Sequence, residues 1–182
     1  MNTNSSDQLD YYLNSLSELG EVLIDSKEPK SVGKGLLRLT LGTVMASKGA
    51  IFISENKTNL FSILVSQGLK KTTPFYAPKS IKKELNKVKH EYIIYDSSIK
   101  WINGELKKNI DLLKIKIIIP LYHKEIMIGM LCIGQKFMKQ EFYDFEIKLL
   151  KIIANHLTKA LFNYILINKI EEKENNLNLK LL

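Results

Sequence analysis

Apolar residues at both ends of the chain recur at three- and four-residue steps, the spacing of one face of an α-helix. The pattern predicts an N-terminal helix over residues 7–24 with a narrow apolar seam, and a second helix from about residue 28 to 46. It also predicts a long helix from about Asp144 to beyond Ile170. The first seam consists of Leu9, Tyr12, Leu13, Leu16, Leu19 and Leu23.

Between these helices the apolar pattern changes to β-rich runs separated by short polar turns. Residues 49–54 and 59–66 are joined by a polar turn, which predicts a hairpin. Residues 114–122 and 125–134 are two apolar strands with a tight turn between them. The remaining predicted elements are a lysine-rich irregular insert at 69–90 with a short helix at 80–87, a strand at 91–95 and a helix at 100–113.

This order of elements predicts an α+β fold. We expect one antiparallel sheet of five or six strands, with the N- and C-terminal helices on one face and a lid of loops and short helices on the other. Pro120 lacks an N–H group, so its strand should be unpaired there, at an edge or a bulge. Gly129 lies among bulky residues and indicates a close approach of a helix or of another backbone.

The net charge of +8 raises the possibility of a nucleic-acid partner, but the residue types argue against a specific one. Arg38 is the only arginine, and lysine lacks the planar fork that reads guanine and grips phosphate. Charge is also uneven: residues 1–28 hold six acids and one lysine, a net of −5, and residues 70–90 hold seven lysines and one glutamate, a net of +6. The lysines form either a solvated face or a basic rim that attracts an anionic ligand or an acidic partner.

The sequence predicts a cytoplasmic protein without a membrane partner. No apolar run approaches the ~20 residues of a membrane span, and the polar N-terminus does not have the pattern of a secretory signal. Cys132 is the single cysteine, which excludes an internal disulfide and fits a reducing compartment.

The order of elements and several motifs resemble the GAF family, whose fold is related to that of the PAS family. Residues 115–134 are similar to that family's strand, Pro-Leu, turn and strand signature with a glycine in the last strand. Residues 49–68 resemble its opening hairpin, and residues 92–96 resemble a strand that often ends in aspartate. The PAS family also has a five-stranded antiparallel sheet, but it lacks a long helix directly after the last strand.

The resemblance covers residues 28–165 and implies a regulatory domain that is not an enzyme. We expect residues 1–27 to form a dimerisation helix, and residues 166–182 to continue the last helix toward an output domain in a longer protein. A ligand would bias the lid and the sheet, and the terminal helices would pass the change to that output domain. The alternative is a module without a ligand whose task is dimerisation and protein interaction.

The resemblance also implies a ligand pocket between the sheet and the insert, at about residues 70–118. Aromatic walls with few polar groups suit a small planar ligand, and Asp96 and Lys116 could orient it. The alternative is that these aromatic residues fill the core under a long loop. The aromatic candidates are Phe75, Tyr76, Tyr92, Tyr95 and Trp101.

No catalytic set or metal site is evident, and the sequence names no cofactor. His90, His123 and His156 are scattered without metal-ligand spacing; we expect His123 to be solvated in its turn and His156 to pack in a helix interface. Haem binding by His123 or His156 and a redox role of Cys132 stay less favoured alternatives. Reduction of free methionine sulfoxide does not fit, because GAF proteins with that activity use several cysteines and this chain has one. Bilin-binding members carry a cysteine in the lid region, and residues 69–113 contain none.

Cyclic-nucleotide-binding GAF domains carry a spaced Asn-Lys-Phe-Asp-Glu signature, which this sequence matches only in part. Two of the five positions match, one is conservative and two depart, so cyclic-nucleotide binding is a further alternative. The corresponding residues are Gln135, Lys136, Phe142, Glu146 and Ile147.

The last helix carries one apolar stripe wide enough to cover a sheet face, which consists of Leu150, Ile153, Ala154, Leu157, Leu161 and Tyr164. A second stripe follows a seven-residue rhythm, which predicts a homodimer with the two terminal helices side by side. Polar residues at several seam positions would fix the register at some cost in stability. The predicted interface consists of Leu9, Leu13, Leu16, Leu149, His156, Ala160, Asn163, Ile167 and Ile170.

Overall fold

The computed structural model describes residues 28–55, 60–68, 75–76, 79–89 and 91–178. The predicted N-terminal helix, with Leu9, Leu13 and Leu16, lies outside these described residues. The elements are α2 (Pro29–Thr43), β1 (Gly49–Glu55), β2 (Leu60–Gln67), β3 (Phe75–Tyr76), α3 (Lys79–Lys87), β4 (Ile93–Ile94), α4 (Gly104–Leu113), β5 (Ile115–His123), β6 (Ile126–Gly134), the short 3-10 helix η1 (Phe137–Lys139) and α5 (Asp144–Asn178).

The strands form one antiparallel six-stranded sheet in the order β3-β2-β1-β6-β5-β4. The two central strands are β1 and β6. On its other side β6 pairs with β5, with Ile118 opposite Cys132 and Pro120 opposite Met130. The predicted pairing of these two apolar strands as antiparallel neighbours is therefore confirmed. It places the most apolar part of the sequence in the middle of the molecule, where both faces of the sheet are covered.

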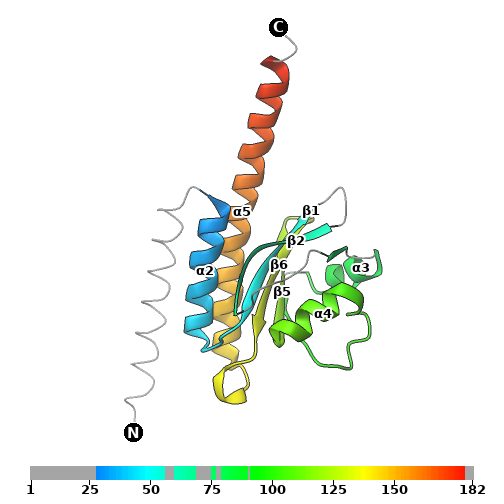
Figure 1. The fold of residues 1–182 in the computed structure, drawn as a ribbon, viewed down its shortest axis with the longest axis vertical. Helices are drawn as coiled ribbons and strands as arrows, with labels where there is room; N and C mark the ends of the chain where they lie inside the picture. The colour runs from blue at the N-terminus through cyan, green and yellow to red at the C-terminus, as the bar shows by residue number, and fades with distance from the viewer. Residues whose placement is uncertain (1–27, 56–59, 69–74, 77–78, 90, 179–182) are drawn as a thin grey trace.

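Helices α2 and α5 cover one face of the sheet, and α3 and α4 lie on the other face (Figure 1). Successive strand residues point to opposite faces, so Ile51 packs in the helix-side core while Ala50 and Phe52 pack in the lid-side core. The predicted α+β arrangement, with terminal helices on one face and a lid on the other, is confirmed for the described residues.

Helix α2 lies very close to the sheet at Gly33, where a larger residue would meet a β2 side chain. It begins at Pro29, a position where the missing N–H costs nothing. A Cβ added at Gly33 would come within 2.9 Å of the Leu64 side chain on β2. Leu36 and Leu37 are buried in the helix-side core. Close packing thus compensates for the low helix propensity of glycine.

Gly129 and Pro120 of the β5–β6 hairpin lie where their sequence context predicts a close approach and an incomplete strand pairing. A Cβ at Gly129 would lie 2.1 Å from the Phe52 carbonyl oxygen, so β1 can approach β6 only because this residue is glycine. Among the described residues, β4 pairs with β5 only at Ile117 and Ile118, which leaves Pro120 beyond the end of that pairing. A register shift also follows directly after Leu121.

None of the helices in the described part of the chain combines the length and the apolar character needed to cross a bilayer.

Candidate functional site

A groove of about 390 Å³ lies at the edge of the sheet, between the end of β4 and the segment that joins β6 to α5. We call it the edge groove. Three of the predicted ligand residues, Tyr95, Asp96 and Lys116, line it together. The other lining residues are Ile94, Gln135, Lys139, Gln140, Glu141 and Phe142.

The edge groove involves the helix side of the sheet, not only the space under the insert. Ile93 packs in the lid-side core, so its neighbour Ile94 points to the opposite face. Phe142 packs against the helix-side core. On the lid side, buried side chains such as Phe52 and Leu85 occupy the interior that the described residues enclose.

The remaining predicted ligand residues are spread over both cores. Tyr92 packs against the helix-side core, and Trp101 packs, partly buried, against the lid-side core. Phe75 and Tyr76 form β3, which pairs with β2, and their side chains lie outside the described part of the structure. For Tyr92 and Trp101, core packing is the role that the structure displays.

Asp96 is a fixed and ionised acid at the end of β4. Its Oδ1 accepts a hydrogen bond from the Ser98 backbone N–H at 2.7 Å and another from the Ser98 hydroxyl. These hydrogen bonds from Ser98, together with the nearby charge of Lys116, lower the pKa of Asp96 below its ordinary value. The carboxylate is therefore charged and held in place at neutral pH.

Tyr95 connects the edge groove to α4. Its backbone N–H donates to the Lys116 carbonyl oxygen at 2.8 Å, which extends the β4–β5 pairing by one step. Lys107 donates to the Tyr95 hydroxyl at 3.1 Å and to Asp111 Oδ2 at 2.9 Å. The hydrogen bonds to Asp111 and Tyr95 raise the pKa of Lys107. Tyr95, itself buried, is thus held from its backbone and from its hydroxyl.

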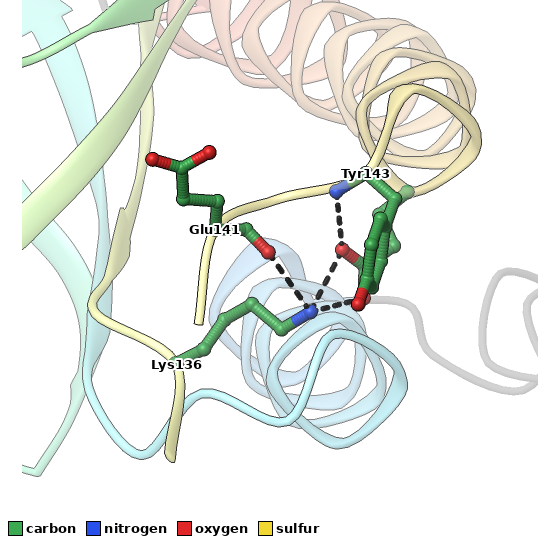
Figure 2. Close-up of polar contacts among 4 residues, drawn as sticks. Lys136, Glu141 and Tyr143 are labelled. Atoms are coloured by element: carbon green, nitrogen blue, oxygen red, sulfur yellow. Dashed lines mark hydrogen bonds and ion pairs between the residues drawn. The ribbon is translucent and has the colours of Figure 1, made fainter. Parts of the chain in front are cut away.

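A buried ion pair fastens the groove segment to the start of α5. Lys136 Nζ donates to Glu146 Oε1 at 2.7 Å and Oε2 at 2.9 Å, and to the Glu141 carbonyl at 3.4 Å. The Tyr143 N–H donates to Glu146 Oε2 at 2.8 Å, so Glu146 also caps the helix. The two paired side chains are 3% and 5% exposed. Figure 2 shows the Lys136 side chain extending toward Glu141 and Tyr143.

This ion pair gives a structural role to two of the residues in the partial cyclic-nucleotide signature. Lys136 and Glu146 bind each other, and Ile147 is buried in the helix-side core. Gln135 and Phe142 line the edge groove. The partial signature therefore falls on the segment that lines the edge groove, although Lys136 and Glu146 bind each other.

Sequence reasoning missed the side of the edge groove that lies just before α5. Lys139, Gln140 and Glu141 belong to the connection between β6 and α5, where the residues follow neither helical nor strand periodicity. That connection is held by tertiary contacts, since Phe137 N donates to the Met45 carbonyl at 2.8 Å. The only signal in the sequence is the short polar run before the last helix.

The histidines and the cysteine do not form a reactive site in the described structure. The expectation that His123 is solvated is wrong: its ring stacks on Phe162 of α5 with centroids 3.6 Å apart, because the β5–β6 turn lies against that helix. His156 is partly buried on α5, and His90 lies outside the described residues. Within the described ranges, no three or more metal-binding side chains gather. Cys132 is fully buried, and burial raises the pKa of its thiol.

The predicted interface residues of α5 divide into a buried and an exposed set. Leu149 is buried in the helix-side core and Ala160 packs against it, whereas Asn163, Ile167 and Ile170 are exposed. Exposed apolar residues that the prediction missed lie along the same helix at Ile152 and Leu166. The available signal was that Leu166 precedes the predicted Ile170 by one helical turn. We call Ile152, Leu166, Ile167 and Ile170 the α5 stripe.

Comparisons with solved structures give the same architecture. The GAF domain of a phosphoenolpyruvate-protein phosphotransferase from Coxiella burnetii matches 87% of this chain and 98% of its own, with a TM-score of 0.66 and 14% identity. A GAF domain/HD domain protein from Geobacter sulfurreducens matches 81% of this chain and 98% of its own, with a TM-score of 0.62 and 18% identity.

A third similar structure is an enzyme. Free methionine-R-sulfoxide reductase from Neisseria meningitidis, solved with its substrate, matches 86% of this chain and 91% of its own, with a TM-score of 0.64 and 13% identity. No protein-family model matches the sequence, and no curated protein matches it significantly. The sheet order, the two helical layers and these structural similarities together show that the chain has the fold of a GAF domain.

Proposed function

We propose that this chain is a regulatory sensor domain that binds a small molecule in the edge groove and passes the signal through α5. The observation that carries the proposal is the continuity between groove and helix. Residues 139–142 line the groove, and α5 begins at Asp144. The buried Lys136–Glu146 pair joins both parts, so a ligand that moves the segment would also move the first turn of α5.

The length of α5 suits the transmission of such a signal. It has 35 residues, which corresponds to about 50 Å, and its C-terminal half projects beyond the sheet (Figure 1). We propose the division suggested by the sequence: a dimerisation segment at 1–27, the sensor at 28–165 and a connection toward an output domain at 166–182. The Geobacter protein, by its description, combines a GAF domain with an HD domain, which supports this organisation.

We also propose that the working form is a homodimer through α5. Leu166, Ile167 and Ile170 are 42%, 53% and 55% exposed on a helix that extends beyond its own domain. Such apolar side chains are covered most simply by the same helix of a second copy, as in a coiled coil. Two helices that meet there would report a change at the edge groove as a change in their register or spacing.

A thermal-shift screen with nucleotides, amino acids and 2-oxoacids tests ligand binding. A compound at about 100 times its Kd stabilises the folded state by ~2.7 kcal/mol, which raises the Tm by about 5–10 °C for a chain of this size. The shift should disappear in Lys116→Met, which removes a charge from the groove. It should persist in Lys34→Met, a control at an exposed lysine of α2 that does not line the groove.

A second candidate function is a dimerisation module without a ligand. It is favoured by the lid-side core, where the described side chains fill the interior. It predicts that no compound in the screen changes the Tm and that both lysine variants behave like the wild type. A shift that depends on Lys116 would reject this candidate.

A further inference from the structure

We infer that the edge groove binds a small zwitterion with an apolar side chain, of the α-amino-acid class. The inference rests on the proposed sensor function and specifies its ligand. The four charged residues of the lining consist of two acids, Asp96 and Glu141, and two bases, Lys116 and Lys139. These charges cancel, so the groove offers both signs within one small volume.

A balanced lining selects against ligands of a single sign. A nucleotide or another polyanion would bring its phosphates next to two carboxylates, at a cost in repulsion and desolvation. A simple amine would meet the two ammonium groups of Lys116 and Lys139. A molecule with one carboxylate and one ammonium can satisfy both halves of the lining with charge-assisted hydrogen bonds.

Strand pairing and local hydrogen bonds prearrange the opposite charges of Asp96 and Lys116 in the groove lining. The Tyr95 N–H bonds the Lys116 carbonyl oxygen at 2.8 Å, so Asp96 follows directly after the strand position paired with Lys116. The two Ser98 hydrogen bonds hold the Asp96 carboxylate without any contribution from a ligand. Prearranged partners lose little conformational entropy on binding, which favours recognition of a small molecule.

The uncharged part of the lining fits the remainder of an amino acid. Ile94 is 57% exposed, so an apolar side chain of the ligand would cover it, with the Phe142 ring as a second apolar wall. Gln135 and Gln140 provide amides that can donate to a carboxylate or accept from an ammonium group. A volume of about 390 Å³ is at the low end for ligand pockets, which suits one amino acid.

The test uses isothermal titration calorimetry of the full chain with two matched series. One consists of L-phenylalanine, phenethylamine and 3-phenylpropionate, and the other of L-leucine, isopentylamine and 4-methylpentanoate. The amino acid of at least one series should bind, and its amine and acid should bind at least about tenfold more weakly, because each lacks one charge-assisted contact. Asp96→Asn and Lys116→Met should each weaken binding by about tenfold or more, and Lys34→Met should leave it unchanged.

The outcomes separate this inference from the proposed function. If an acid binds as tightly as its amino acid, or if neither amino acid binds, the zwitterion inference is overturned. In that case the sensor proposal still stands, provided that another compound of the wider screen gives a Lys116-dependent Tm shift. If no compound of that screen does so, both proposals fail.

Discussion

At the scale of single residues, the Lys136–Glu146 ion pair stands out because both of its charges are buried. Replacing Lys136 with Met leaves the Glu146 carboxylate buried without its cation, and the Tyr143 N–H alone cannot compensate for it. We expect Lys136→Met to lower the free energy of unfolding by about 3–5 kcal/mol in urea denaturation.

A double variant tests whether the buried charge is the cause. Adding Glu146→Gln removes the unpaired charge and keeps an oxygen for the Tyr143 N–H, so most of the lost stability should return. Lys108→Met is a control, because its ion pair with Glu105 is exposed and should contribute no more than ~0.5 kcal/mol. If the single and double Lys136 variants were equally unstable, the loss would come from packing and not from charge.

Gly129 is the residue at which a single methyl group should do the most damage. In Gly129→Ala the new Cβ would lie 2.1 Å from the Phe52 carbonyl, so β1 and β6 must separate at the centre of the sheet. We expect a loss of about 3 kcal/mol or more, seen as a lower urea midpoint. Gly42→Ala, with nothing within 4 Å of its new methyl group, should instead gain about 0.5–1 kcal/mol. If both variants changed the free energy of unfolding by a similar amount, the close approach of β1 at Gly129 would not be the cause.

Tyr122 makes stability depend on pH at the alkaline end. Burial raises the pKa of Tyr122 to about 12, above the value of about 10 in an unfolded chain. The folded state therefore favours the neutral phenol, a contribution that is complete below about pH 10 and is lost as the pH rises toward about 12. The difference in unfolding free energy between wild type and Tyr122→Phe should shrink across that interval. A difference that stays constant from about pH 9 to 12 would refute it.

The residues of the edge groove show how far side-chain chemistry can be foreseen from sequence. Tyr95, Asp96 and Lys116 were candidates because the resemblance implies a pocket at residues 70–118, and all three line the edge groove. Lys139 and Glu141 were not, because tertiary contacts such as the Phe137–Met45 hydrogen bond determine where their segment lies. Periodicity carries no information about such a segment.

At the scale of elements, the central hairpin and the helices follow their sequence patterns closely. The predicted strand at 91–95 is shorter in the structure, where β4 consists of Ile93 and Ile94 and one further hydrogen bond at Tyr95. The chain then turns at Asp96, whose side chain binds Ser98, so the strand ends where a local side-chain bond competes with the ladder. An edge strand has one neighbour only, and its length is therefore weakly specified by the sequence.

Helix α5 shows the limit of pattern analysis within one element. Two apolar stripes run along it at slightly different periods. The stripe predicted to cover the sheet is buried in the helix-side core at Leu150, Ile153, Ala154, Leu157 and Leu161. The sheet covers the face that includes Leu149, which was predicted to lie in the dimer seam. The face at Ile152 and Leu166 stays exposed. The sequence therefore shows that a helix face is apolar, but the position of a residue such as Leu149 in the core or in a dimer seam becomes clear only from the packing.

The α5 stripe predicts a dimer that charge can disrupt. Leu166→Glu with Ile170→Glu should give a monomer by light scattering, because two copies would then bury four carboxylates against each other. Leu112→Glu is the matched control: this residue is 55% exposed, as Ile170 is, but lies on α4 of the lid. A monomeric wild type, or a double variant that keeps the dimer mass, would reject the α5 interface.

At the scale of the whole molecule, one sheet separates two packed layers. The lid-side layer contains α3 and α4, and the helix-side layer contains α2 and α5 (Figure 1). The edge groove lies where the sheet edge meets the helix-side layer, beside the start of the longest helix. A ligand there can change α5 only if the β6–α5 segment has two conformations and the ligand binds the protein more tightly in one of them.

Hydrogen exchange of the wild-type chain, with and without the compound that raises the Tm most in the screen, tests this coupling most directly. We predict added protection in residues 135–147, which include the groove segment and the first turn of α5, and at Asp96 and Lys116. Protection confined to α3 and α4, or no change at residues 135–147, would contradict a signal that begins at the edge groove and travels along α5.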